Sequence, residues 1–270
     1  MWTFGVITDI HFGPEASYGG RLRKLTGQAP RLVEAFSRRM RDEVKPDLVF
    51  NLGDCIEDAS PEQDLVLYED CMAHLRRWGG RLENVAGNHD RIHLEASQLR
   101  RAWGLPPDGP LYRCFDLGEL HVVVLYTHER KDQDITIDDD QLAWLEADLH
   151  HHADRDVLVV MHHSAADQDV GRNRWFSTCP HLCLVGNRRA LRRRLAAHGR
   201  VRLVLNGHLH WNHLDVIDGI PYVTLQSLIE NVDDDAPGRA AAAHAVVRMT
   251  SERVLVEVEG AEPCRYQFDR

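Results

Sequence analysis

The sequence predicts an α/β protein built as a four-layer αββα sandwich, with two mixed sheets flanked by helices. In the first half of the chain, short apolar runs of strand length alternate with helical patterns. This alternation is typical of parallel strands that carry helices on the faces of the sheet. In the second half, strand-like runs follow one another closely, which favours antiparallel pairing. A mixed two-sheet core covered by helices accounts for both halves.

Each expected element rests on an apolar run, an apolar stripe at helical spacing or a turn signal. The first helix carries apolar residues at helical spacing from Leu32 to Val44, and Pro46 ends it. Gly118-Glu119 is interpreted as the turn of a hairpin. We expect strands at 2–8, 47–52, 82–86, 111–117, 120–126, 156–161, 201–206, 213–217, 221–225, 243–250 and 253–258, and helices at 31–44, 62–78, 138–150 and 187–198.

The chain is expected to form one domain. Its 270 residues are enough for a large domain with a well-buried core. It contains no low-complexity linker and no internal repeat, and the acidic stretch 233–238 is expected to be a loop. We therefore predict a single domain over 1–270, in which the strands at 213–258 complete the sandwich.

Composition excludes some classes of function. The chain has 32 Lys and Arg against 42 Asp and Glu, a net charge of −10, which repels phosphate backbones, so no nucleic acid polymer is expected as a partner. No apolar run approaches the roughly 20 residues that span a bilayer. The apolar start from Trp2 to Ile7 is expected to be a strand and not a signal peptide. These observations favour a cytoplasmic location without a membrane partner.

The six cysteines include no CxxC pair. A structural zinc site built from cysteine pairs is therefore not expected, and the thiols are expected to be reduced.

Polar side chains that can bind metals follow five of the expected strands, at the point where each strand ends. In open α/β sheets, sites form outside the carboxyl ends of the strands, so these side chains are expected to converge on one rim. Glycine precedes three of the five clusters and permits tight turns there. The clusters are Asp9 and His11; Asp54; Asn88, His89 and Asp90; His162 and His163; and His208 and His210.

Each cluster taken alone also has an ordinary structural interpretation. An Asp-x-His after a strand is usually a turn residue beside a surface histidine, and Gly-Asp is common in turns. His162 and His163 are also compatible with a core histidine beside an exposed one. Five such clusters, each at a strand end, favour a functional site over coincidence.

The five blocks resemble those of the calcineurin-like metallophosphoesterase family, over residues 3 to about 230. The blocks that carry the resemblance are Asp9-Ile10-His11, Gly53-Asp54, Gly87-Asn88-His89-Asp90, Val160-Met161-His162-His163 and Gly207-His208-Leu209-His210.

The resemblance implies a centre of two transition-metal ions, Mn, Fe or Zn, since imidazole and carboxylate donors suit such ions. One metal would be bound by Asp9, His11 and His210, the other by Asn88, His162 and His208, and Asp54 would bridge them. The two ions of such sites lie about 3.5–4 Å apart.

The implied reaction is hydrolysis of a phosphate ester by a metal-bound hydroxide. His89 would act on the leaving group as general acid or as electrostatic stabiliser, and Asp90 would orient it. The family often has Pro after the first histidine pair, where this chain has Ser164. His162 or His163 is then the ligand, and the family spacing favours His162.

Within the family, the chain is most similar to class III cyclic-nucleotide and glycerophosphodiester phosphodiesterases. It lacks the Asp-Arg-Gly extension of protein phosphatases, and Glu57 stands where purple acid phosphatases have a tyrosine ligand. The implied substrate is a small nucleotide-like or glycerol-type phosphodiester. A phosphomonoesterase or a nucleotide pyrophosphatase is the alternative within the same chemistry.

Two alternatives come from other classes. An inactive scaffold, like the metallophosphoesterase-fold subunit of the retromer complex, is disfavoured because all seven ligand positions are filled. A nuclease is disfavoured by the net charge of −10. Because relatives often pair through the strand-rich C-terminal part, a homodimer is also implied.

Substrate is expected to meet two long loops, 13–28 and 164–186. The basic residues of the first loop suit a phosphate, although a solvated loop explains any single one of them slightly better. Trp175 and Phe176 of the second loop suit stacking on a base or packing against a partner subunit. The candidate substrate-binding residues are Arg21, Arg23, Lys24, Tyr126, His128, His163 and Trp175.

Overall fold

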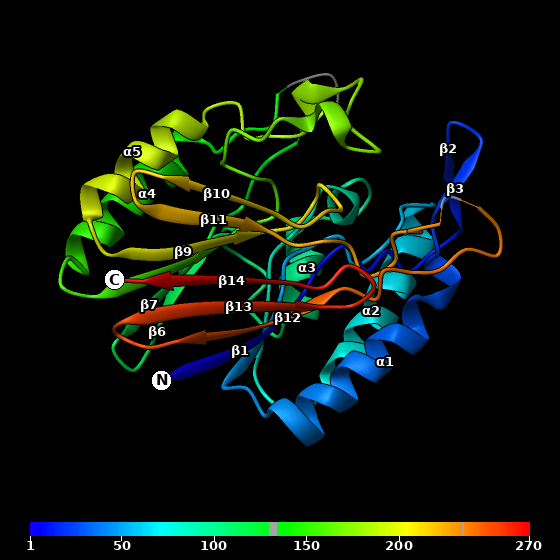
Figure 1. The fold of residues 1–270 in the computed structure, drawn as a ribbon, viewed down its shortest axis with the longest axis horizontal. Coiled ribbons are helices and arrows are strands. Elements are labelled where there is room, and N and C mark those ends of the chain that lie inside the picture. The colour runs from blue at the N-terminus through cyan, green and yellow to red at the C-terminus, as the bar shows by residue number, and fades with distance from the viewer. Residues whose placement is uncertain (130–133, 234) are drawn as a thin grey trace.

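The computed structural model describes residues 1–129, 134–233 and 235–270, and these form four layers (Figure 1). Two six-stranded sheets lie at the centre. Helices α1 and α2 cover the outer face of one sheet, and α4 and α5 cover the outer face of the other. The predicted αββα sandwich is therefore confirmed. Residue 234 of the expected acidic loop lies outside the described residues.

The elements have the following bounds. The strands are β1 (Trp2–Ile7), β2 (Ala16–Tyr18), β3 (Arg21–Lys24), β4 (Leu48–Asn51), β5 (Leu82–Asn84), β6 (Arg113–Leu117), β7 (Leu120–Val124), β8 (Asp156–Val160), β9 (Val201–Asn206), β10 (His213–Ile217), β11 (Ile220–Thr224), β12 (His244–Met249), β13 (Arg253–Glu259) and β14 (Cys264–Asp269). The α-helices are α1 (Ala29–Arg39), α2 (Pro61–Arg76), α3 (Ala96–Ala102), α4 (Asp139–His151) and α5 (Arg188–His198).

Both sheets are mixed, and both draw strands from the two halves of the chain. The first has the order β14-β13-β12-β1-β4-β5, in which β1, β4 and β5 run parallel and β12 pairs antiparallel with β1. The second has the order β10-β11-β9-β8-β7-β6, with a parallel centre and one antiparallel strand at each edge. Because the parallel strands end at the same edge, the loops after β1, β4, β5, β8 and β9 lie together.

Three apolar clusters hold the four layers together. One fills the space between the sheets and includes Phe4, Phe50 and Leu205, which are fully buried. The other two lie between each sheet and its helices. Alternate residues of a strand point to opposite faces. The central strands face the other sheet on one side and helices on the other, so they are apolar on both faces, as the sequence indicated.

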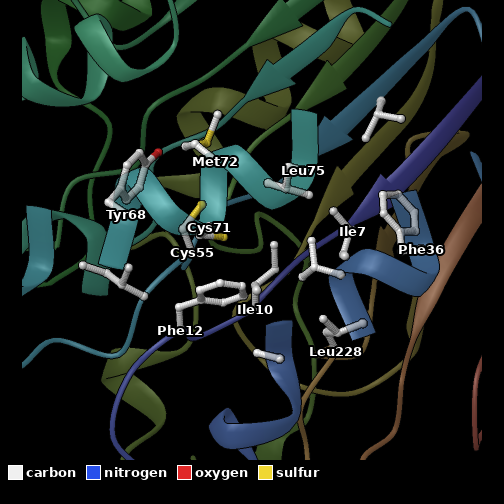
Figure 2. Close-up of a cluster of buried hydrophobic side chains, with 14 of the residues drawn as sticks. Ile7, Ile10, Phe12, Phe36, Cys55, Tyr68, Cys71, Met72, Leu75 and Leu228 are labelled. Carbon is white, nitrogen blue, oxygen red and sulfur yellow. The ribbon is translucent and has the colours of Figure 1, made fainter. Parts of the chain in front are cut away.

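The cluster beneath α1 and α2 extends directly under the loops that follow β1 and β4. Figure 2 shows Ile10 and Phe12 packed near Cys55, Tyr68 and other members of this cluster. These apolar residues alternate along the chain with polar ones of the expected site. Burial of the apolar members therefore fixes the two loops against the sheet.

Several elements differ from the expectation. The first helix continues from α1 through a π-helical turn, Met40–Val44, and ends at Lys45 in a left-handed conformation. Part of the expected loop 13–28 forms the β2–β3 hairpin. Helix α3 was not expected, because it is short and its sequence shows no strong apolar periodicity. Strand β14 was missed, although its apolar residues occupy alternate positions.

Within 1–129, 134–233 and 235–270, every helix is too short or too polar to cross a membrane. The six cysteines, all in described parts of the chain, form no disulfide.

Leu205 tests the importance of the core between the sheets. We expect Leu205→Ala to lower the free energy of unfolding by about 2–5 kcal/mol, because it leaves a cavity between two rigid sheets. Val66→Ala is the matched control, since Val66 is 65% exposed, and a change within about 0.5 kcal/mol is expected. Urea unfolding measures both. Equal losses in the two variants would contradict the assigned core.

Candidate metal centre

The five predicted clusters converge at one rim of the two sheets. The loops after β1 and β4 are bonded to each other, since His11 N donates to Asp54 O at 3.0 Å. The loop after β9 joins them, because the backbone N–H of His208 lies 3.0 and 3.1 Å from the two carboxylate oxygens of Asp9. Residues separated by about 200 positions thus form one site.

The backbone of this rim is strained at the predicted ligands. Five of the seven have a left-handed backbone with φ between 50° and 69°: Asp9, His11, Asp54, His208 and His210. Non-glycine residues rarely adopt this conformation, and it concentrates at functional sites, where the surrounding structure holds it in place. The short loops aim these side chains inward at a cost in backbone energy.

Two of the three glycines that precede the clusters, Gly87 and Gly207, are required by close approach and not by a positive φ. A Cβ on Gly87 would lie 2.1 Å from Asp54 Oδ1, and a Cβ on Gly207 would lie 2.0 Å from Thr8 Oγ1. Gly53, by contrast, does have a positive φ of 106°. Any side chain at Gly87 or Gly207 would push the loops of the site apart.

Each of four predicted histidine ligands has one ring nitrogen held by a fixed acceptor. His162 Nδ1 and His208 Nε2 donate to the carbonyls of Leu52 and Leu182, both at 2.8 Å. His11 Nδ1 lies 2.8 Å from Glu57 Oε2, and His210 Nδ1 lies 2.9 Å from Glu230 Oε2. Such contacts fix the tautomer and leave the other nitrogen as a metal donor.

The inward nitrogens of His11 and His210 show that the cluster fits a cation. Their Nε2 atoms are 3.3 Å apart. Because each Nδ1 donates to a carboxylate, the two Nε2 atoms face each other as acceptors for one positive charge, which either a proton or a metal ion between them supplies. His210 Nε2 is also 3.4 Å from Asp9 Oδ1. Asp9, His11 and His210 therefore form the first donor set.

The second donor set lies around His162. Its Nε2 is 3.1 Å from Asn88 Oδ1 and 3.3 Å from Asp54 Oδ2. Asp54 Oδ2 is also 3.8 Å from His11 Nε2, so the Asp54 carboxylate lies between the two sets, as a bridging ligand must. His208 belongs to the same side, in a group with His162 and His163. Nitrogen and oxygen donors of this kind suit Mn, Fe or Zn.

The side-chain contacts favour His162 over His163 as the metal ligand, as the family spacing does. His163 has both ring nitrogens near other side chains, Thr127 Oγ1 at 2.7 Å and Glu129 Oε2 at 3.3 Å. Its ring packs on His208 with 4.2 Å between centroids. His163 is therefore a packed neighbour of the second donor set.

The candidate centre contains several charged side chains close together, even without metal ions. Burial opposes ionisation of Asp54, but the positive charges of His162 and His89 lower its pKa well below the usual value. Burial likewise opposes the charged form of His210, but contacts with Asp9 and Glu230 raise its pKa to about 9. In the metal-free protein, protons therefore occupy positions that a metal would take, so metal and protons compete for the same donors.

Asp90 does not orient His89, which corrects that prediction. The Asp90 carboxylate is fully buried and accepts backbone N–H groups of Gly87, Asp54 and Cys55 at 2.8–3.0 Å. It ties the loops after β4 and β5 together. His89 Nδ1 instead lies 2.5 Å from Asp58 Oδ1.

Lys24 of the β2–β3 hairpin enters the site and is 4% exposed. Its Nζ is 2.7 Å from Glu57 Oε2, 3.3 Å from His89 Nε2 and 3.5 Å from His11 Nδ1. The sequence offered Lys24 only as one of three basic residues in a loop. Lys24 reaches the site because the β2–β3 hairpin places it there.

Three acidic residues that support the site were not predicted: Glu57, Asp58 and Glu230. Glu57 and Asp58 follow Asp54 by three and four positions, and that acidic pair was an available signal. No signal in the sequence indicates Glu230, because it lies in the loop after β11. This loop packs on the loop after β1, where Ser227 Oγ donates to the Asp9 carbonyl at 2.8 Å.

Trp175, another candidate for substrate binding, lies beside the first donor set. Its ring centroid is 5.4 Å from that of His210, and its Nε1 donates to Glu230 Oε2 at 2.9 Å. The Arg23 guanidinium carbon lies 6.0 Å from the centroid of the Trp175 ring. Arg21 is exposed on β3, and the His128 ring packs on Tyr126 with centroids 5.6 Å apart.

Comparison with known proteins agrees with this architecture. Residues 3–212 match the family described as calcineurin-like phosphoesterase. A probable cyclic nucleotide phosphodiesterase of Synechococcus is 27% identical over 210 residues, covering 76% of this chain and 71% of that protein.

Solved structures share the fold at low sequence identity. A dimetal phosphatase from Danio rerio has a TM-score of 0.78 at 18% identity, with 98% of both chains covered. GAP50 of Plasmodium, described as the anchor in the inner membrane complex, has a TM-score of 0.60 at 13% identity, covering 99% of this chain and 88% of that one.

With a family match over most of its length and the predicted ligands gathered at one rim, the chain belongs to the calcineurin-like phosphoesterases.

Proposed function

We propose that the protein is a phosphodiesterase that hydrolyses a small nucleotide-like or glycerol-type diester with the help of two transition-metal ions. The observation that carries the proposal is the pair of donor sets that share Asp54, whose Oδ2 lies 3.8 Å from His11 Nε2 and 3.3 Å from His162 Nε2. The Synechococcus relative, a probable cyclic nucleotide phosphodiesterase, supports a diester substrate.

When bound, two such ions supply Lewis acidity at the phosphoryl oxygens and make a water nucleophile available near neutral pH. The ligands proposed for them are Asp9, His11 and His210 on one side and Asn88, His162 and His208 on the other, with Asp54 shared.

His89 is the proposed group at the leaving oxygen. Its Nδ1 faces Asp58 and its Nε2 faces the interior of the site. Asp58 fixes the ring and favours the protonated form: burial and Lys24 oppose the charge, but Asp54 and Asp58 raise the pKa of His89 above its usual value. A protonated His89 can donate to the departing oxygen or stabilise its charge. Asp58 acts as its positioning residue.

The rim of the site favours a small substrate. Tyr18 of the β2–β3 hairpin and Trp175 of the loop after β8 approach within 5.5 Å between ring centroids. Trp175 also contacts His210, and Lys24 lies 5.3 Å from its ring. Two segments distant in sequence thus meet beside the metal ligands. Their aromatic rings suit a base or glycerol group better than a polymer.

Loss of one ligand from each set tests the two-metal reaction. Asn88→Ala and His210→Ala are each expected to lower Mn²⁺-dependent hydrolysis of bis(p-nitrophenyl) phosphate by more than about 100-fold, since even residues behind the ligands contribute 10–100-fold. His151→Ala, at an exposed histidine of α4, should keep the wild-type rate. Metal content by plasma mass spectrometry should fall in the two ligand variants.

The same assay with p-nitrophenyl phosphate separates the proposal from its alternatives. Faster turnover of the monoester would replace the phosphodiesterase by a phosphomonoesterase. Protein that binds no metal and cleaves neither compound would indicate a scaffold.

His89→Asn tests the leaving-group role. We expect kcat to fall by about 10²–10⁴-fold for a diester with an alkoxide leaving group, and much less for a nitrophenolate, which departs without a proton. Asp58→Asn should show the same dependence with a smaller loss and unchanged metal content. A loss equal for both leaving groups would assign His89 to charge stabilisation alone.

A further inference from the structure

A second group of metal-capable side chains lies far from the candidate metal centre. It comprises Cys114 and Asp116 on β6, His121 on β7, and Asp148 on α4. His121 is the second residue of β7, so this group lies at the amino-terminal end of a strand whose carboxyl end faces the candidate centre. We call it the Cys114 cluster.

Three different donors converge in this cluster. Cys114 Sγ lies 3.1 Å from Asp148 Oδ1, and His121 Nε2 lies 2.8 Å from Asp148 Oδ2. One ligand atom from each of these three residues lies within 4.8 Å of the others. In a tetrahedral zinc site with Zn–S of about 2.3 Å and Zn–N or Zn–O of about 2.0–2.2 Å, ligand atoms are about 3.3–3.6 Å apart. The three side chains reach that spacing with small adjustments.

The contacts behind His121 prepare it as a ligand. Its Nδ1 lies 2.8 Å from Asp116 Oδ1. A histidine that donates one ring N–H to a carboxylate and turns the other nitrogen toward further donors has the usual arrangement of a metal-bound imidazole. His121 is 1% exposed, so its ring cannot turn away into solvent.

His152 packs against the His121 ring. Its ring stacks on that of His121, with centroids 3.7 Å apart and planes at 17°. Its Nδ1 donates to the carbonyl of Asp148 at 2.9 Å. Arg155 Nη1 lies 3.4 Å from Asp116 Oδ2, whereas the other oxygen of Asp116 contacts His121. The positive charge of Arg155 therefore acts on Asp116, which is not one of the three donors.

We propose that Cys114, His121 and Asp148 bind a single zinc-class ion at a third metal site, independent of the phosphoesterase centre. Sulfur, imidazole and carboxylate together select Zn²⁺ or Co²⁺ over Mg²⁺ or Ca²⁺. Binding releases the thiol proton of Cys114, and any proton on His121 Nε2, to solvent. Water completes the coordination.

The proposed ion links elements that otherwise meet through side chains alone. Cys114 and His121 belong to the hairpin at the edge of the second sheet, and Asp148 belongs to the last turn of the helix that covers it. An ion here fixes the carboxyl end of α4 on the β6–β7 hairpin. Its role is structural, and it does not depend on the proposed function.

Without a metal, the same contacts describe a protonated His121 clamped between two carboxylates. Burial opposes the charge, but hydrogen bonds to Asp148 and Asp116 raise the pKa of His121. This arrangement uses no property of Cys114 beyond a weak S–H donor. The thiol therefore distinguishes the two possibilities: the metal site requires it as a thiolate ligand, and the clamp does not.

Cobalt titration of the full, metal-free chain tests the proposal. Co²⁺ bound to a thiolate gives a near-ultraviolet charge-transfer absorption, which Co²⁺ bound only to imidazole and carboxylate does not. None of the seven proposed ligands of the phosphoesterase centre is a cysteine, so that absorption reports the Cys114 cluster. The wild type is expected to develop it with one equivalent of Co²⁺ and to bind three ions in total.

Cys114→Ser should abolish the absorption and lower the total to two ions. Cys264→Ser, at another partly buried strand cysteine, should leave both unchanged. Asn88→Ala should keep the absorption although its hydrolytic activity is lost, which separates this proposal from the proposed function.

A wild type without the absorption would overturn the proposal and leave the protonated clamp. An absorption that persists in Cys114→Ser would overturn it as well, by assigning the thiolate to another cysteine. Circular dichroism establishes that Cys114→Ser is folded, and His121→Gln provides a second variant that should lose the absorption with its thiols intact.

Discussion

The buried carboxylate of Asp54 lies between two sets of donors, 3.8 Å from His11 and 3.3 Å from His162. Much of the surrounding structure serves to hold a negative charge in a place where water cannot reach it. Its other oxygen accepts the backbone N–H of His89 at 2.9 Å, and its own N–H donates to Asp90. An isolated carboxylate at this depth would be costly, so the positive charge of neighbouring histidines, or of metal ions, is part of the stability of the rim.

The sandwich supplies the rim by geometry. Parallel strands end together, and the two sheets face each other, so loops from both sheets meet at one edge. Close packing between the loops then removes their freedom: Gly87 and Gly207 approach neighbouring side chains so closely that a Cβ would lie about 2 Å from them. The left-handed backbone at five predicted ligands is retained because packing beneath the loops, through residues such as Ile10 and Phe12, leaves no relaxed alternative.

The parts that sequence predicted well are those encoded by local patterns. Apolar runs located every strand of the two sheets except β14, and the polar residues expected at the strand ends do lie together at one rim. Prediction failed where the partner is distant in sequence. Nothing near Glu230 indicates that it contacts His210 at 2.9 Å, because the contact depends on how the loop after β11 packs. The resemblance implied that Asp90 orients His89, whereas the Asp90 carboxylate accepts hydrogen bonds from three backbone N–H groups.

The histidines illustrate why residue type does not decide role. His11 and His121 are both buried and both face carboxylates, but their surroundings differ in charge and in donor type. His11 has the Lys24 ammonium group 3.5 Å from its Nδ1 and the His210 imidazole 3.3 Å from its inward Nε2, so a proton or a metal ion lies between the two Nε2 atoms. His121 lies between Asp116 and Asp148, with the Cys114 thiol beside it, and can be satisfied by a proton or by a metal. At His11 the two facing imidazoles can share either a proton or a metal ion, whereas the Cys114 cluster gains a metal only if the thiol gives up its proton.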